Sequence, residues 1–324
     1  MASEPTTLQE AVIYFADPKN CREYLVARRW PNGVACPACG STKVKFSETH
    51  NRWQCASHHP KRQFTVKSGT IFEDSPLGMD KWLMAMWMVI NCKNGVSSYE
   101  ISRDLNITQK SCWFMLHRLR EAMQDEQTGG KLSGEVEVDE TFIGAKARNM
   151  HADVKERKLQ GRKGGTQGKS IVAAVLERGG KEKSSKVRAK VVDKRKKKDL
   201  QALVRDNVEP QSALYSDALK SYDGLSEDFA HQVVDHAVAY VDGQVHTNGM
   251  ENFWSLLKRG LNGTYISVEP YHLFRYVDEQ AFRFNNRSMT DAERFSFVCS
   301  QVTGRRLTWN RLTGKEGEAR QYAE

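Results

Sequence analysis

Three acidic residues, far apart in the chain, coincide with regular elements that the sequence predicts. Asp139 lies within one strand-like run, Asp217 ends another, and Glu251 lies near the start of a short helix. Carboxylates collected from separate elements of an open sheet are typical ligands for the divalent metal ions of phosphoryl transfer. A chain with this pattern is therefore expected to fold so that the three acids converge.

The elements around these acids indicate an α/β fold. The predicted strands are Glu135–Ile143, Lys169–Leu176, Val187–Val192, Ala213–Asp217 and His231–Val234, and the predicted helices are Lys197–Asn207, Asn248–Leu261 and Tyr271–Asn285. Strands come first and helices are interleaved later, which predicts a mixed sheet with flanking helices.

Asp139 is not the only acid on its predicted strand. Alternation of side chains places Asp139 on the face opposite Val138. An inward carboxylate needs a partner, and a metal ion would offset the cost of removing it from water. Glu137 shares this face and Glu140 is adjacent, so the first ligand is not unique. Taken alone, Asp139 or Asp217 also fits a surface or capping role.

Glu251 has a structural alternative as well. Asn248 could cap the helix with Glu251 three residues later, which is the capping-box pattern. However, Glu251, Ser255 and Lys258 share one polar stripe at helical spacing, opposite an apolar face. Lys258 lies two turns, roughly 10 Å, beyond Glu251. The functional alternative is that Glu251 binds a metal ion and Lys258 contacts the adjoining phosphate.

The N-terminal region carries two residue pairs of the kind that bind zinc, Cys36-Pro-Ala-Cys39 and Cys55-Ala-Ser-His58. Two such pairs, separated by a short segment, close a tetrahedral zinc site in a zinc ribbon. His59 competes with His58 for the fourth position, and buried or redox-active thiols are the alternative. A zinc ribbon is usually a structural module, and it is compatible with contact to DNA or another partner.

Residues 98–119 are predicted to form a helix, a tight turn and a second helix, which is the helix-turn-helix arrangement. Apolar positions of both helices would form a small core, leaving Gln109, Lys110 and Arg118 exposed to a groove or to phosphates. A helical hairpin that only packs within the chain is the alternative. The basic balance of the chain and the zinc motif favour DNA binding.

Charge and cysteine usage indicate an intracellular protein with a polyanionic partner. The chain has 324 residues, a net charge of +9 and a pI near 9.1. Seven cysteines, three of them clustered with histidines, favour metal binding and buried thiols over a disulfide framework. The run Trp82–Ile90 is too short to span a bilayer, and residues 1–10 lack a signal-peptide layout. The expected location is the cytoplasm, in association with the nucleoid.

Longer motifs around these residues resemble a known family. They are Asp139-Glu-Thr-Phe-Ile-Gly, Tyr215-Ser-Asp217, the run from His246 to Gly260 with Gly263-Thr-Tyr, and the segments His272-Leu-Phe-Arg-Tyr and Phe282-Arg-Phe-Asn. Together they resemble the DDE transposases of bacterial insertion sequences, in particular the ISXO-like group with an N-terminal zinc ribbon, over nearly the whole chain. His58 or His59 stands where the commoner ribbon has a fourth cysteine.

The resemblance implies a ribonuclease-H-like domain in which Asp139, Asp217 and Glu251 hold two Mg²⁺ or Mn²⁺ ions, with Lys258 and Arg259 near the DNA. It implies metal-dependent cleavage and strand transfer on double-stranded DNA. The ribbon, with one structural Zn²⁺, and the helix-turn-helix would hold the terminal inverted repeats, and a homodimer or larger assembly would pair two ends. A DNA-binding regulator with a catalytically silent domain, or a nuclease without strand transfer, is the alternative.

The predicted regions follow from these patterns. They are 1–75, the N-terminal helix and zinc ribbon; 76–130, the helix-turn-helix; 131–290, the ribonuclease-H-like catalytic domain; and 291–324, a C-terminal tail. Thr128-Gly-Gly-Lys131 is predicted to be a linker. The basic insert 145–168 and the run Lys194–Lys198 are expected to face solvent.

Overall fold

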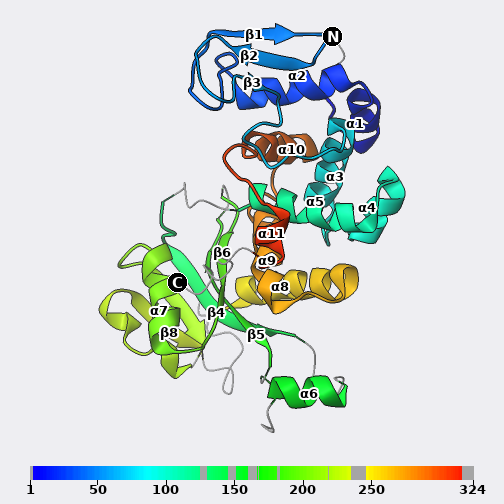
Figure 1. The fold of residues 1–324 in the computed structure, drawn as a ribbon. Coiled ribbons are helices and arrows are strands. Elements are labelled where there is room, and N and C mark those ends of the chain that lie inside the picture. The colour runs from blue at the N-terminus through cyan, green and yellow to red at the C-terminus, as the bar shows by residue number, and fades with distance from the viewer. Residues whose placement is uncertain are drawn as a thin grey trace. The chain divides into compact units, whose positions relative to one another are not determined.

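The computed structural model describes residues 3–124, 130–144, 151–159, 166, 168–180, 183–217, 219–234 and 246–315. The chain divides into two compact units (Figure 1), one made of Met1–Gln124 with Asn286–Tyr322 and the other built from Asp125–Asn285. Part of the predicted linker and much of the basic insert lie outside the described residues. No helix in the described part of the chain is both long and apolar enough to cross a membrane.

Helices make up most of the first unit. They are α1 (Leu8–Phe15), α2 (Pro18–Arg29), α3 (Met79–Asn91), α4 (Ser98–Leu105), α5 (Gln109–Ala122), α10 (Asp291–Ser300) and α11 (Trp309–Leu312). Between α2 and α3 the chain forms a small antiparallel sheet of β1 (Val44–Ser47), β2 (Arg52–Cys55) and β3 (Gln63–Phe64). The ring of Trp53 contacts those of Phe46 and Phe64, which gives this sheet a small aromatic core.

The C-terminal segment completes the first unit. Phe295 of α10 is 0% exposed, and its ring contacts Phe15, Tyr24 and Trp87 of α1, α2 and α3. Residues 291–324, set apart as a tail on sequence grounds, thus include a helix that contributes to the core of the N-terminal helices.

The second unit is built on a mixed sheet. Its strands are β4 (Glu135–Ile143), β5 (Ser170–Glu177), β6 (Lys186–Val192), β7 (Ala213–Asp217) and β8 (Ala230–Val234). The spatial order is β6-β5-β4-β7-β8, in which β6, β5 and β4 are antiparallel and β4, β7 and β8 are parallel. Each strand lies within one residue of its predicted bounds. The arrangement confirms the predicted mixed sheet and is consistent with a ribonuclease-H-like fold.

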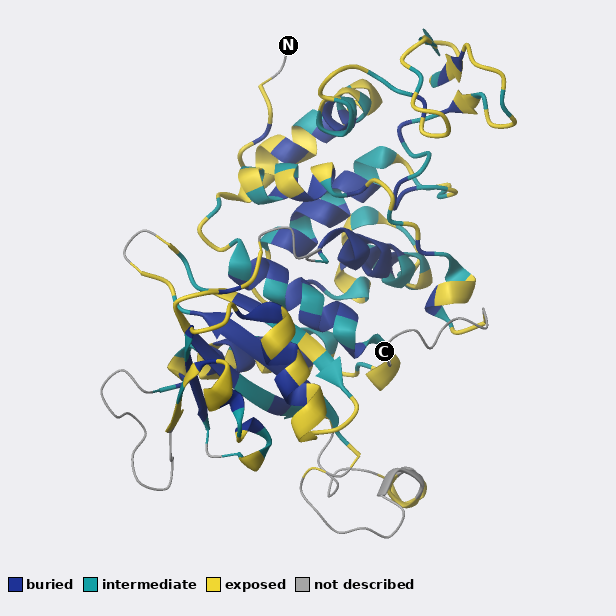
Figure 2. Ribbon diagram, turned by 90° about the vertical axis from the view of Figure 1, so that its left-hand side faces the viewer, coloured by how far each residue is buried: buried dark blue, intermediate teal, exposed yellow. Residues whose placement is uncertain are grey.

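Helices cover both faces of this sheet. Helix α7 (Lys197–Asn207) packs on the face that carries Val136, Val138 and Leu214. Helices α8 (Asn248–Arg259) and α9 (Leu273–Asn285) cover the other face, and Figure 2 shows the buried strands between the helices. Short segments complete the unit: helix α6 (Ala152–Leu159), 3-10 turns at Lys220–Tyr222, Leu225–Glu227 and Pro270–His272, and a π-helix at Gly260–Tyr265.

The pleat of β4 decides which of its residues reach which helix. Because successive side chains point to opposite faces, Val136 and Val138 face α7, whereas Glu137 and Asp139 face α8. The basic run Lys194–Lys198, which leads into α7, is exposed as expected.

Candidate functional site

Asp139 lies on β4 beneath helix α8. The indole Nε1 of Trp254 donates a hydrogen bond to its Oδ2 at 2.8 Å, and the backbone N–H of Glu140 donates to its Oδ1 at 2.8 Å. Burial removes water from this carboxylate and raises its pKa to about 7, although both hydrogen bonds act in the opposite direction. A nearby cation would stabilise the ionised form, because it would offset the cost of desolvation.

Asp217 ends β7, the parallel neighbour of β4. The register pairs Glu137 with Tyr215, so two residues further along, Asp139 and Asp217 are level on adjacent strands and share a face. After burial, which is the main cause, the charge of Asp217 also contributes to the raised pKa of Asp139. The fold therefore brings the first two predicted acids together.

Glu251 lies in the first turn of α8, one turn before Trp254, and is exposed. Thr247 occupies the N-cap position, but its side chain makes no capping hydrogen bond. The Glu251 N–H donates to the Thr247 carbonyl at 3.0 Å. The capping box with Asn248 is therefore not formed. In the described part of the chain, no hydrogen bond or ion pair engages the Glu251 carboxylate.

The three acids do not form a closed ligand cluster. Among the described residues, the group of potential ligands whose atoms all lie within 4.8 Å of one another consists of cysteines and a histidine. Asp139 and Asp217 are fixed by their strands, whereas the exposed side chain of Glu251 is free to change rotamer.

The two acids next to Asp139 are already engaged. Glu140 faces α7, where its Oε2 accepts a hydrogen bond from the Tyr222 hydroxyl at 2.7 Å. Glu137 is buried against the start of α8 and is paired with Arg178 at 2.8 Å. After burial, the charge of Asp217 also contributes to the raised pKa of Glu140, so Glu140 lies near Asp217 as well. Asp139 is the acid of this strand that lies level with Asp217 on the face covered by α8.

Lys258 and Arg259 are the last two residues of α8, and both are exposed. Lys258 continues the polar stripe of Glu251 two turns further along the helix. Cations at this end also complement the helix dipole, so their position has a structural explanation beside the functional one.

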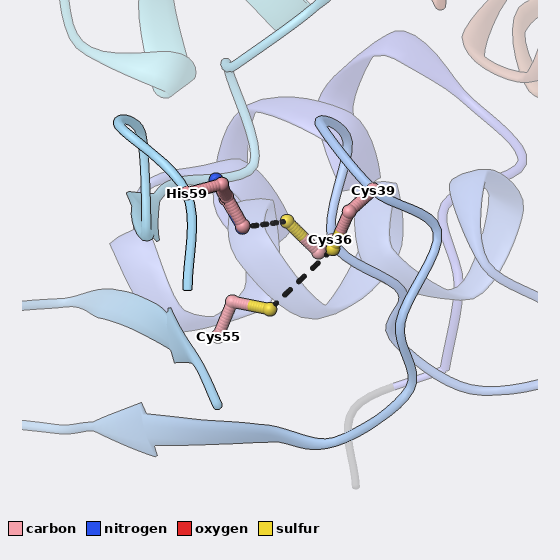
Figure 3. Close-up of side chains that lie close together, drawn as sticks. All are labelled: Cys36, Cys39, Cys55 and His59. Carbon is pink, nitrogen blue, oxygen red and sulfur yellow. Dashed lines mark hydrogen bonds between the residues drawn. The ribbon is translucent and has the colours of Figure 1, made fainter. Parts of the chain in front are cut away.

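A second site lies in the small sheet of the first unit. Figure 3 shows Cys36, Cys39, Cys55 and His59 around a common centre. Cys36 Sγ is 3.4 Å from His59 Nε2, and Cys39 Sγ is 3.6 Å from Cys55 Sγ. A tetrahedral zinc ion with bonds of about 2.3 Å to sulfur and about 2.0 Å to nitrogen separates its ligands by roughly 3.5–3.8 Å. The donor set and the spacing fit a structural zinc ion.

His59, and not His58, completes this group, which corrects the fourth ligand predicted from the sequence. His58 has the usual Cys-x-x-His spacing, but its side chain is exposed, whereas Nε2 of His59 is directed at the cysteines. Burial raises the pKa of the Cys55 thiol, but hydrogen bonds with His59, Ser57 and Cys39 outweigh it and lower the pKa to about 6. This favours the thiolate, which is the form that binds metal.

Helices α4 and α5 are joined by a short turn in which Asn106 has a left-handed conformation. Lys110 is exposed and Gln109 is half-buried at the start of α5. Arg118 is only 4% exposed, and its guanidinium donates to the Glu73 carbonyl at 2.5 Å. The prediction that Arg118 is exposed to DNA is wrong, because the second half of α5 is buried on all sides.

Sequence reasoning missed two residues of the α8 contact. The helical pattern of the sequence does not single out Trp254, which binds Asp139, or Gly249, at which a Cβ would lie 2.9 Å from Oε2 of Glu137. Both carried a signal: a buried tryptophan needs a partner for its N–H, and a glycine in a first helical turn allows close approach of another group. Neither signal identifies the partner.

Comparisons with known proteins cover both sites. Residues 131–285 match the ISXO2-like transposase domain, and residues 17–58 match the transposase zinc-ribbon domain. An uncharacterized protein in transposable element ISH50 of Halobacterium salinarum is 28% identical over 258 residues, which is 76% of this chain and 84% of that protein. An uncharacterized transposase-like protein of Haemophilus influenzae is 33% identical over 85 residues, which is 26% of this chain and 68% of that protein. The match to the ISXO2-like transposase domain spans the mixed sheet and helices α7 to α9, and the match to the zinc-ribbon domain spans most of the zinc ribbon. The chain therefore belongs to the family of ISXO2-like transposases.

Proposed function

We propose that this transposase binds the terminal inverted repeats of its element and carries out metal-dependent DNA strand cleavage and strand transfer. The observation that carries the proposal is the level placement of Asp139 and Asp217 on adjacent parallel strands, under the helix that carries Glu251. Membership of the family supports the same reaction.

Asp139, Asp217 and Glu251 are the residues that would hold the divalent metal, two Mg²⁺ or Mn²⁺ ions. Their oxygen atoms suit these hard cations, and the raised pKa of Asp139 fits a carboxylate that gains from a positive charge. When bound, the ions would supply Lewis-acid stabilisation of the phosphate and activation of water or of a DNA 3′-hydroxyl.

The other residues of the site would hold these ligands and the DNA in place. The Trp254 N–H orients the Asp139 carboxylate, and strands β4 and β7 fix the spacing of the two aspartates. Lys258, exposed on the same stripe as Glu251, would contact the DNA backbone with its neighbour Arg259. No covalent protein intermediate is required.

The DNA ends would be held by the zinc ribbon and by the α4–α5 pair acting as a helix-turn-helix, with Gln109 and Lys110 as contacts. Phosphate contacts of this kind make binding steeply dependent on salt. Pairing of two ends would require a homodimer or a larger assembly. The enzyme would work in the cytoplasm on the DNA of the nucleoid.

The test combines the purified full chain with Mg²⁺ or Mn²⁺ and DNA that carries the element ends. Joined products are expected. Nicks without joining would indicate a nuclease, and bound but uncut DNA would indicate a regulator.

Asp139→Asn, Asp217→Asn and Glu251→Gln are each expected to lower strand transfer by on the order of 10²–10³-fold or more, because each removes a fixed charge from the reacting centre. Binding to element ends should persist. Glu269→Gln, which changes an exposed acid outside the site, is the matched control. Undiminished transfer by any of the first three variants would remove that residue from the site.

A further inference from the structure

The start of helix α8 is held by a buried acid from the sheet. Glu137 is 1% exposed, and its Oε2 accepts a hydrogen bond from the Met250 N–H at 2.8 Å. Met250 lies in the first turn of α8, where backbone N–H groups have no partner within the helix, and the side chain of Thr247 does not supply one. Glu137 therefore acts as a cap from another element, and its negative charge suits the positive end of the helix dipole.

Arg178, which directly follows β5, fixes Glu137 from the other side. Its Nε donates to Glu137 Oε1 at 2.8 Å, and its Nη1 donates to Glu135 at 3.0 Å. Its Nη2 donates to the carbonyl of His246 at 2.6 Å and lies 2.9 Å from Nδ1 of the same residue. Because a guanidinium can only donate, this Nδ1 is the acceptor. One arginine thus joins β4 to the residues that lead into α8.

A side chain at Gly249 would have to displace Glu137 and press on Leu176. A Cβ at this position would lie 2.9 Å from Oε2 of Glu137 and 3.0 Å from Cδ2 of Leu176. Glycine in a helix costs about 1 kcal/mol relative to alanine. Close approach to the sheet gives a reason for glycine here that the helix by itself does not.

We propose that Glu137 and Arg178 are positioning residues for the metal site. They fix the start of α8, and with it Glu251, which directly follows Met250. Glu137 is not itself expected to bind the metal, because Arg178 already balances its charge, whereas the two donors to Asp139 are neutral. The inference rests on the proposed function of the three acids, and it adds two residues that act through α8.

Gly249→Ala disturbs the contact between α8 and the sheet without changing any charge and without lowering helix propensity. Alanine favours the helix, so a purely local role predicts wild-type behaviour. If the contact between the start of α8 and the sheet fixes the position of Glu251, both the affinity for Mn²⁺ and the rate of strand transfer should fall about 10–100-fold. This is the range found for residues that orient metal ligands. Gly180→Ala is the matched control, because a Cβ there meets nothing within 4 Å. Mn²⁺ affinity is measured by electron paramagnetic resonance on the zinc-loaded full chain.

Glu137→Gln tests the charge itself, because the amide keeps the size of the side chain and an acceptor for Met250 but not the ion pair with Arg178. The same loss of Mn²⁺ affinity and transfer is expected, with DNA end binding retained. Glu135→Gln, which changes the exposed acid paired with the same arginine, should have neither effect. Thermal melting checks folding, and Arg178→Lys, which keeps the charge but not the fork of donors, replaces Glu137→Gln if that variant does not fold.

The outcomes separate this inference from the proposed function. Wild-type Mn²⁺ affinity and transfer in both Gly249→Ala and the folded charge variant would overturn the positioning role. A wild-type protein that neither binds Mn²⁺ in the second unit nor transfers strands would overturn the function of the three acids instead.

Discussion

At the scale of single residues, Asp139 couples the candidate site to pH. Burial raises its pKa from 3.8 to about 7. Because the folded-state pKa is the higher one, the folded state binds more protons between these values, and its stability falls as pH rises through that range. The loss is at most about 1.4 kcal/mol per pH unit. Above pH 7 the carboxylate is ionised in both the folded and the unfolded state, and the whole free-energy cost of burying its charge remains.

Asp139→Asn is therefore expected to stabilise the zinc-loaded protein in the absence of Mg²⁺. The gain should reach up to about 4 kcal/mol at pH 8 and be clearly smaller at pH 5.5, where the folded wild type is already protonated. Urea unfolding at the two pH values measures it, with the exposed Asp193→Asn as control. Equal gains at both pH values would show that Asp139 titrates at its ordinary pKa.

At the scale of elements, the zinc ribbon depends on its metal. Strands β1, β2 and β3 have 4, 4 and 2 residues, and a sheet of this size buries too little apolar surface to be stable without further support. Free energy of metal binding in such a module is free energy of folding. The four ligands come from two loops and one strand end, so removal of the ion should release all three.

His59→Ala is expected to lower the affinity for zinc by more than about 100-fold, because loss of a ligand costs more than loss of a group that orients one. His58→Ala changes the adjacent, exposed histidine and should leave zinc binding intact. Zinc content per chain after dialysis against a weak chelator measures both. Loss of zinc in the His58 variant alone would reverse the assignment of the fourth ligand.

At the scale of the whole molecule, the end of the chain completes the unit that its beginning starts. Residues after Asn285 group with residues 1–124, and Phe295 lies among aromatic rings of α1, α2 and α3. The first unit is therefore expected to need both ends of the chain, and removal of residues 286–324 would expose its core.

Phe295→Ala is expected to lower the free energy of unfolding of the first unit by about 3–5 kcal/mol, the usual cost of removing a buried phenylalanine. Phe297→Ala changes the same residue type two positions later, where the side chain is 41% exposed, and should cost about 0.5 kcal/mol. Hydrogen exchange of amides in α1 to α3 measures the unit separately from the second one. Equal effects of the two substitutions would show that α10 is not part of this core.

Much of the fold could be predicted, because the pattern that forms an element is local. Alternating apolar residues placed each strand of the mixed sheet within one residue of its bounds, and the helical stripe of α8 gave its start at Asn248. The same alternation put Asp139 on the face away from Val138. The cysteines of the ribbon were identifiable because zinc requires this residue type at close spacing.

By itself, the sequence determined the elements, the apolar face of each and the types of side chain available for a metal. Only the tertiary structure decided that His59 completes the ribbon, that Arg118 is buried, that Glu251 does not cap its helix and that Trp254 binds Asp139. The physical reason is that periodicity records which face of an element leaves water. The partner that covers that face is set by packing between residues distant in the chain, as Glu137 and Met250 are.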